Sequence, residues 1–182
     1  MKVPHVLSAA PDFFIVKNLT SSSAWAVFHT TLGATKYLAL NETTAVATAS
    51  NVWNDTAPTA TTISVATWGP VNTSANQHIA YCFHDVTGYS KYGTYTGDGG
   101  DGTGPTVTTG FKPDFVMVKR SSGTGNWQIY DTRRDSKLLF PNDSAAEQNL
   151  VYVDFLSTGF KPIAPSSATG DTNINLNGTV SL

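Results

Sequence analysis

Short apolar runs, separated by clusters of Ser, Thr, Gly and Pro, recur along most of this chain. In the segments 25–29 and 127–131, the odd-numbered and the even-numbered positions carry two different sets of side chains. This period of two is expected of a β-strand with two different faces. Further strands are predicted at 13–17, 36–40, 62–67, 79–84, 89–94, 115–119, 151–156 and 173–176. Only the segment 144–148 predicts a helical turn, so the pattern indicates an all-β protein.

The first predicted hairpin recurs in the second half of the chain. PDFFIVKNLTSSSAWAVFHTT at 11–31 aligns with PDFVMVKRSSGTGNWQIYDTR at 113–133. Its repeated anchors are Phe13 with Phe115 and Trp25 with Trp127, which we interpret as core residues that fix the hairpins. Identical anchors at constant spacing are poorly explained by chance. The sequence therefore predicts two tandem related β repeats, at 1–86 and 87–182.

Many short strands with Gly, Pro and Thr turns predict an antiparallel β-sandwich or a jelly-roll-like fold. The two repeats differ at their ends. The first ends in the apolar run IAYCF at 79–83, whereas the second ends in GTVSL, which lacks most of such a closing strand. Either the two repeats share strands in one sandwich, or another chain completes an edge. The second alternative favours a homo-oligomer, with a trimer preferred.

The composition narrows the class of protein further. Of 182 residues, 40% are hydrophobic, which is enough for a packed core and excludes wholesale disorder. Only 13% are charged, the net charge is −2, and no basic run occurs, so neither nucleic acid nor a membrane is an expected partner. The sequence shows no signal peptide pattern. A single cysteine, Cys82, excludes an internal disulfide and a cysteine-built metal site.

No catalytic residues are predicted. The sequence contains none of the common nucleophile, metalloprotease or phosphate-loop motifs. A glycosidase would need two carboxyl groups about 5–9.5 Å apart in a cleft. The acidic residues of the segment 131–147 lie close in sequence, but we interpret them as a solvated face. The chain is therefore not expected to be an enzyme, and a glycan-cleaving depolymerase is the enzymatic alternative.

One segment has the chemistry of a ligand site. The loop GDGGDGTG at 97–104 carries Asp98 and Asp101, whose carboxylates are candidate calcium ligands together with backbone carbonyls. The spacing of a calcium-binding EF-hand is absent, and glycines also serve turns that need a positive φ. A linker loop is the favoured interpretation, so no cofactor is expected and Ca²⁺ is the alternative.

Aromatic side chains give the candidates for ligand contact. Aromatic rings on an exposed sheet face can stack on sugars while neighbouring polar groups bond to the hydroxyls. Trp53 and Trp68 lie in a Thr/Asn/Pro-rich stretch and have no counterparts in the other repeat, so we predict that they are exposed. Tyr92 belongs to the segment TGYSKYGTYT at 87–96. These three residues are the candidate glycan contacts.

A set of short motifs occurs along the chain: IAYCF at 79–83, GYSK at 88–91, YTG at 95–97, GFKPDF at 110–115, VKR at 118–120, Trp127 and NDSAAE at 142–147. Together these motifs resemble a repeat module of tailed-phage virion proteins, especially the tail fibre and other tail proteins of marine phages. The resemblance covers nearly the whole chain, although Val6 and Ser8 stand where the module usually has glycines. It implies a structural or adhesive role without transferable catalytic residues.

The resulting prediction is a non-enzymatic structural protein on the exterior of a phage particle, made in the host cytoplasm and assembled with copies of itself and with other virion proteins. A tail fibre or spike that contacts host surface glycans is the first choice. A capsid decoration or head-fibre protein is the alternative, because 182 residues are few for a complete fibre. A stand-alone carbohydrate-binding module is the further alternative.

Overall fold

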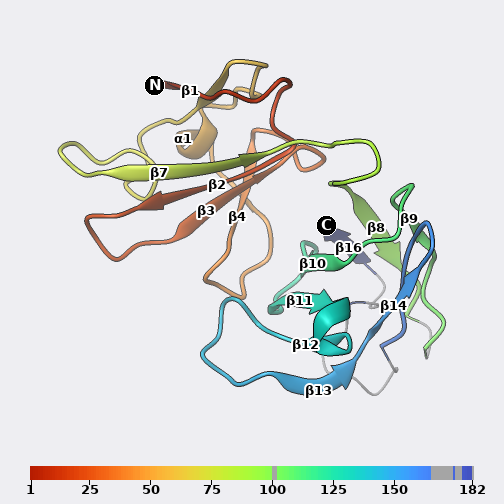
Figure 1. The fold of residues 1–182 in the computed structure, drawn as a ribbon. Helices are drawn as coiled ribbons and strands as arrows, with labels where there is room; N and C mark the ends of the chain where they lie inside the picture. The colour runs from red at the N-terminus through yellow and green to blue at the C-terminus, as the bar shows by residue number, and fades with distance from the viewer. Residues whose placement is uncertain (100–101, 165–173, 175–177, 182) are drawn as a thin grey trace. The chain divides into compact units, whose positions relative to one another are not determined.

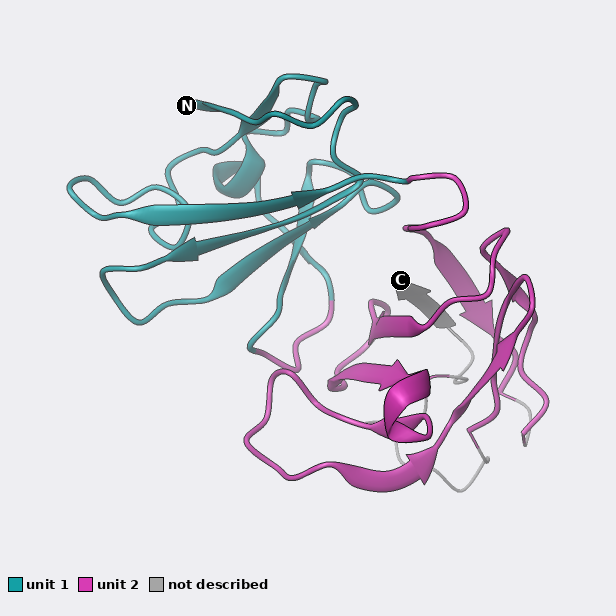
Figure 2. Cartoon of the chain, in the orientation of Figure 1, with its two compact units in different colours: residues 1–41, 46–85 teal, residues 42–45, 86–182 magenta. Residues whose placement is uncertain are grey.

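The computed structural model describes residues 1–99, 102–164, 174 and 178–181 of the chain (Figure 1). The chain divides into two compact units. Unit 1 consists of residues 1–41 and 46–85, and unit 2 consists of residues 42–45 and 86–182 (Figure 2). The division lies next to the repeat boundary predicted after residue 86. The sequence carried no sign that the short loop 42–45 belongs with the second unit.

Unit 1 contains an antiparallel five-stranded sheet in the order β5-β4-β3-β2-β7, so β7 is an edge strand. A separate antiparallel pair joins β1 and β6, and one short helix, α1, follows β5 (Figure 1). The bounds of these elements are β1 Lys2–Pro4, β2 Phe13–Asn18, β3 Trp25–His29, β4 Lys36–Ala39, β5 Ala47–Thr48, α1 Ser50–Trp53, β6 Thr62–Ser64 and β7 His78–Phe83.

The core of unit 1 lies on one face of this sheet. Alternate side chains of β2 and β3 point to that face because successive residues of a strand point to opposite sides. The rings of Phe14 and Phe28 stack there with centroids 4.6 Å apart. Helix α1 and the segments after it cover them. The buried members of this cluster are Phe14, Val16, Ala26, Phe28, Val52, Trp53, Ile63, Val65 and Val71.

Unit 2 contains three antiparallel sheets, with the strand orders β11-β10-β16-β8, β14-β15-β9 and β12-β13. A turn of 3-10 helix, η1, follows β11. The bounds are β8 Thr94–Gly97, β9 Val107–Thr108, β10 Phe115–Arg120, β11 Trp127–Asp131, η1 Thr132–Arg134, β12 Lys137–Leu138, β13 Gln148–Val151, β14 Val153–Leu156, β15 Gly159–Pro162 and β16 Gly178–Ser181.

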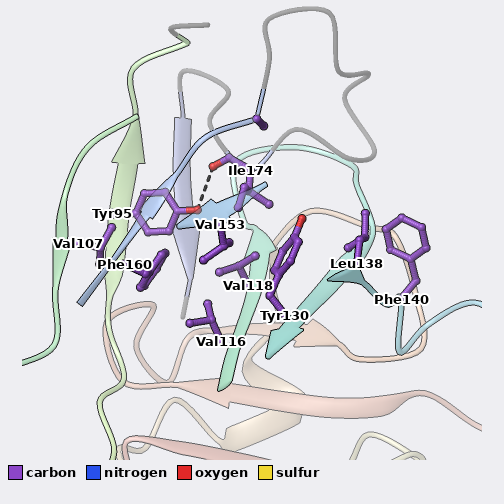
Figure 3. Packing of buried hydrophobic residues seen from close by; sticks show 11 residues of the cluster. Tyr95, Val107, Val116, Val118, Tyr130, Leu138, Phe140, Val153, Phe160 and Ile174 are labelled. Carbon is purple, nitrogen blue, oxygen red and sulfur yellow. Dashed lines mark hydrogen bonds between the residues drawn. The ribbon is translucent and has the colours of Figure 1, made fainter. Parts of the chain in front are cut away.

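The core of unit 2 draws side chains from all three sheets (Figure 3). Val118 and Tyr130 come from the first sheet, Val153 and Phe160 from the second. The phenol of Tyr95 donates a hydrogen bond of 2.9 Å to the backbone carbonyl of Ile174, which satisfies a polar group inside the core. Burial raises the pKa of Tyr95 well above its usual value, so this phenol stays protonated.

The all-β prediction is confirmed, and every pairing between the described strands is antiparallel. Predicted strands at 36–40, 62–67 and 79–84 correspond to β4, β6 and β7. The strand predicted at 89–94 begins only at Thr94, and the one at 173–176 lies outside the described residues except for Ile174. The helical turn predicted at 144–148 is wrong, since residues 144–147 are irregular and Gln148 begins β13. None of the helices in the described part of the chain is long and apolar enough to cross a membrane.

The two hairpins predicted from the repeat have the same register. Lys17 lies opposite Trp25 in the β2–β3 pair, and Lys119 lies opposite Trp127 in the β10–β11 pair. The sequence predicts that the end of the chain, 177–182, lacks most of a closing strand. In the structure residues 178–181 form β16, which pairs with β8 along its length but with β10 only at Lys119 and Arg120.

Candidate functional site

Trp53, predicted as an exposed glycan contact, is fully buried. The short helix α1 turns its ring into the core of unit 1, where it meets Phe14 edge-on at 4.8 Å and Phe28 at 6.2 Å. Its indole N–H donates a hydrogen bond of 3.0 Å to the carbonyl of Lys36. The prediction was wrong because the polar residues around Trp53 in the sequence are loop residues, and the helical turn that inserts the ring is too short to leave a periodic signal.

The other two predicted glycan contacts are half-buried. Trp68 packs against the unit 1 core, with its ring 4.8 Å from that of Tyr37 and inclined by 52°. Tyr92 lies just before β8 in unit 2. The ring of Trp68 remains partly accessible. Trp68 belongs to unit 1 and Tyr92 to unit 2, so neither unit contains both candidate contacts.

Two exposed aromatic side chains lie on β7. The sequence did not identify them as candidate contacts. Tyr81 and Phe83 are each 43% exposed. They lie opposite Ile15 and Phe13 in the β2–β7 pair, on the sheet face that is turned away from the unit 1 core. The ring of Phe83 is 6.1 Å from that of Phe13. We call Tyr81 and Phe83 the β7 aromatic pair.

Polar groups gather where β7 ends, next to the β7 aromatic pair in sequence. The Oγ of Ser8 and the Nε2 of His84 lie 3.4 Å apart at an exposed position. The carboxylate of Asp12 accepts a hydrogen bond of 2.8 Å from the backbone N–H of Asp85. Exposed aromatic rings have the chemistry that stacks on a sugar. The signal for this surface was the alternation in residues 79–83, which places Tyr81 and Phe83 on one face.

Two asparagines hold the predicted repeat anchors in the same way. The side-chain oxygen of Asn41 accepts a hydrogen bond of 2.8 Å from the backbone N–H of Trp25. In unit 2, Asn142 accepts one of the same length from the backbone N–H of Trp127. Trp127 is buried, as expected of a core anchor, while Trp25 is only half-buried.

A lysine stands opposite each of these tryptophans. The ammonium group of Lys17 is 5.8 Å from the centroid of the Trp25 ring, within the range of a cation–π contact. Lys119 is fully buried and donates to the carbonyls of Arg120, at 2.9 Å, and of Thr43, at 3.3 Å. Burial, with a smaller contribution from the charge of Arg120, lowers the pKa of Lys119 to about 8. Lys17 also donates to the backbone carbonyls of Asn18 and Ser21, so both lysines hold backbone in place.

The acidic residues of the segment 131–147 take part in structural contacts. Asp131 caps η1 by accepting from the backbone N–H groups of Arg133 and Arg134, and it pairs with the Arg134 side chain at 2.7 Å. Arg134 also pairs with Glu147 at 3.0 Å, and Glu147 lies 3.6 Å from Lys137. Desolvation alone would raise the pKa of Asp131, but the bonds from Arg134 outweigh it and keep this pKa below its usual value. Asp131 is thus held ionised by a positive partner.

A comparison with models of protein families assigns this chain to one family. The model of the family described as "Domain of unknown function (DUF7483)" matches residues 1–178. The chain belongs to the DUF7483 family. No curated protein and no solved structure matches it.

The match spans both units of this DUF7483 protein. It includes both hairpins, both asparagines that hold the tryptophans, and the β7 aromatic pair. The match to the family model therefore covers both units.

The predicted calcium loop of this DUF7483 protein is described only in part. Asp98 is exposed, and Asp101 lies outside the described residues. Within the described ranges, no group of three or more His, Cys, Asp or Glu side chains is placed to hold a metal ion. The geometry thus adds nothing in favour of a calcium site at this loop.

Proposed function

We propose that this DUF7483 protein is a non-enzymatic structural protein on the exterior of a tailed-phage particle, of the tail-fibre or spike type. One observation carries the proposal. Residues of the motifs that resemble phage tail proteins serve the scaffold: the run 79–83 forms most of β7, and Asn142 holds the backbone of Trp127. Motif residues that build hairpins, and do not converge on a reactive centre, suit a structural module.

The two units are, in this proposal, related copies of one hairpin module. The shared register of β2–β3 and β10–β11 supports it, as do the equivalent contacts of Asn41 and Asn142. The lysines opposite the tryptophans add a third correspondence. Repetition of a stable hairpin is a common way to extend a structural protein.

The arrangement of acidic side chains supports a role without catalysis. A depolymerase needs one carboxyl group with a raised pKa to donate a proton and a second that stays ionised. Asp131 has the opposite environment to a proton donor, since Arg134 lowers its pKa. Glu147 is paired with two basic side chains, Arg134 and Lys137.

Within this proposal the β7 aromatic pair contacts glycans of the host surface, and the half-buried Trp68 is a separate candidate contact. Two partly exposed rings offer only a weak site. A virion presents many copies, and several weak sites that engage together raise the apparent affinity by about 10²–10⁴ without any new contact. Assembly into a homo-oligomer, with a trimer favoured, would supply those copies.

The place of the protein on the particle tests the proposal directly. An antibody raised against the chain is used for immunogold electron microscopy of purified virions. Label at the distal tail supports a fibre or spike protein. Label scattered over the head instead assigns the chain to capsid decoration or a head fibre. Virions without label refute the virion proposal and favour a stand-alone carbohydrate-binding module.

Glycan contact is tested with beads that carry many copies of the protein. The measurement is the retention of these beads on a surface coated with host polysaccharide. The double variant Tyr81→Ala/Phe83→Ala is expected to lose retention, and the exposed Tyr89→Ala, outside this surface, serves as the control. Equal retention of the double variant and the unchanged protein refutes the assignment to β7. Release of soluble sugar over time would instead reveal a depolymerase.

A further inference from the structure

The hairpin turn of unit 2 is completed by a loop from an earlier part of the chain. Residues 42–45 follow Asn41 in sequence but belong to unit 2. The backbone carbonyl of Thr43 accepts a hydrogen bond of 2.8 Å from the backbone N–H of Gly125 and one of 3.3 Å from the ammonium group of Lys119. Both donors lie at the turn between β10 and β11. One exposed carbonyl group thus satisfies two donors of this hairpin.

The corresponding donors of unit 1 have no such acceptor. The two hairpins share their register and the length of their turns, so Ser23 corresponds to Gly125 and Lys17 to Lys119. Among the described residues no group accepts from the backbone N–H of Ser23, and its buried hydroxyl has no hydrogen-bond partner either. Lys17 donates to two neighbouring backbone carbonyls, which leaves one of its three N–H groups for a further acceptor. Because unpartnered buried polar groups are costly, an acceptor at this position would be favourable.

The side chains around the turn are also more exposed in unit 1 than in unit 2. Leu19 is 58% exposed, whereas Ser121, at the corresponding position, is 2% exposed. Trp25 is half-buried, whereas Trp127 is buried. The turn of unit 1 is nevertheless preformed, since the side-chain oxygen of Asn18 accepts two of its backbone hydrogen bonds. A preformed turn with an apolar side chain beside unused donors is suited to binding another loop.

The loop that contacts the turn of unit 2 recurs in sequence between β12 and β13. Asn-Glu-Thr-Thr-Ala at 41–45 aligns with Asn-Asp-Ser-Ala-Ala at 142–146, and both asparagines accept from the backbone N–H of a repeat-related tryptophan. Residues 143–146 are exposed. Ser144 corresponds to Thr43, and within the described part of the chain no group donates to the carbonyl of Ser144. The second loop therefore carries the same acceptor without a donor.

We propose that residues 143–146 of one copy of the chain bind the turn 19–24 of a second copy, as residues 42–45 contact the turn of unit 2. The carbonyl of Ser144 accepts from the backbone N–H of Ser23 and from the ammonium group of Lys17. The two surfaces differ, so the interface is heterologous and joins copies head to tail, in a closed ring or an open chain. The inference rests on the proposed function only in its expectation of a homo-oligomer, for which it names the surfaces.

The test is the self-association of the full chain in sedimentation velocity experiments, at concentrations up to about 1 mM because so small an interface binds weakly. Leu19→Lys places a charge on the turn of unit 1, and Ala145→Lys places one on the loop of unit 2. Both side chains are exposed, so neither substitution disturbs a core. Val6→Lys in unit 1 and Tyr89→Lys in unit 2 are the matched controls, at exposed positions outside both surfaces.

The unchanged chain and both controls should form larger species as the concentration rises. Leu19→Lys and Ala145→Lys should each weaken this association about ten-fold or more. An equimolar mixture of these two variants should associate again, but only to dimers. The reason is that Ala145→Lys retains the turn and Leu19→Lys retains the loop, so one intact interface forms between them.

Amide hydrogen exchange gives a second measurement on the unchanged chain, and exchange at Ser23 should slow as the concentration rises. Melting curves identify any variant that fails to fold, and the exchange result then decides. The proposal is overturned by an unchanged chain that stays monomeric, by variants that associate like their controls, or by a mixture that does not associate. Protection of Ser23 that is independent of concentration would place the loop of the same chain on the turn and would also overturn it. None of these results depends on where antibody label lies on virions, so the proposed function fails or stands separately.

Discussion

The side-chain oxygen of Asn142 accepts a hydrogen bond of 2.8 Å from the backbone N–H of Trp127. The amide nitrogen of Asn142 in turn donates to the side chain of Asn126 at 2.7 Å, so this one residue ties the chain after β12 to the start of β11. Asn41 makes the corresponding bond to Trp25 in unit 1. In each hairpin an asparagine side chain thus accepts a hydrogen bond from the backbone N–H at the start of the second strand.

Asn142→Ala should lower the free energy of unfolding by about 1–3 kcal/mol, because it removes the hydrogen bonds of Asn142 to Trp127 and Asn126. The loss is measured by differential scanning calorimetry. Asn149→Ala, at an exposed position of β13, is the matched control and should change stability by less than about 0.5 kcal/mol. Equal effects of the two variants would show that the bond between Asn142 and Trp127 does not stabilise the fold.

Replacing each of the two repeat-related tryptophans with alanine should lower the free energy of unfolding by different amounts. Trp127→Ala empties a buried site and should cost about 3–5 kcal/mol. Trp25→Ala should cost clearly less, since Trp25 is half-buried. Denaturant unfolding followed by far-UV circular dichroism compares the two variants. A larger loss for Trp25→Ala would contradict the burial that the structure assigns.

The hairpins could be predicted from the sequence because their information is local. Alternation along residues 25–29 and 127–131 defines strands, and the repeat supplied independent support for each one. The antiparallel pairing between neighbouring strands then follows from the short connections. The pairing of β16 with β10 and β8 could not be predicted in this way, since it joins the end of the chain to strands far away in sequence.

The candidate site was harder to predict because exposure depends on what covers a residue. Trp53 has polar neighbours in sequence, yet α1 turns it into the core. Phe115 matches Phe13 in the repeat, yet it is exposed because no described residue takes the place that Phe83 has in unit 1. Sequence pattern identifies the face on which a side chain lies, and long-range packing decides whether that face is covered.

The buried Lys119 should make stability rise with pH on the alkaline side. Burial lowers the pKa of this amine from 10.5 to about 8, so between these values the unfolded chain binds a proton that the folded chain has released. The free energy of unfolding then increases with pH, at most by about 1.4 kcal/mol per pH unit for one group. The penalty of burying the charged amine is fully present below pH 8.

Denaturant titrations between about pH 7.5 and 8.5 measure this slope. The window stops there because burial raises the pKa of the Cys82 thiol, ordinarily 9.0, and of Tyr95 and Tyr130, ordinarily 10, and these acids make stability fall with pH above their ordinary values. Lys119→Met should abolish the rise, whereas Lys17→Met, at the corresponding position of unit 1, should keep it. A rise that survives Lys119→Met must come from another group.

Gly159 should tolerate no side chain, because β15 passes too close to β9. A methyl group at this position would overlap the carbonyl of Val107, and Gly159 itself pairs with Thr108. Gly159→Ala must push β9 away or distort the β14–β15 turn, at a cost of about 1–3 kcal/mol. Gly93→Ala is the matched control, since nothing lies within 4 Å of the added methyl group there, and it should leave the melting temperature nearly unchanged. Calorimetry on the two variants decides the point: if Gly159→Ala melts together with Gly93→Ala, the close approach of β15 to β9 is not a feature of the folded protein.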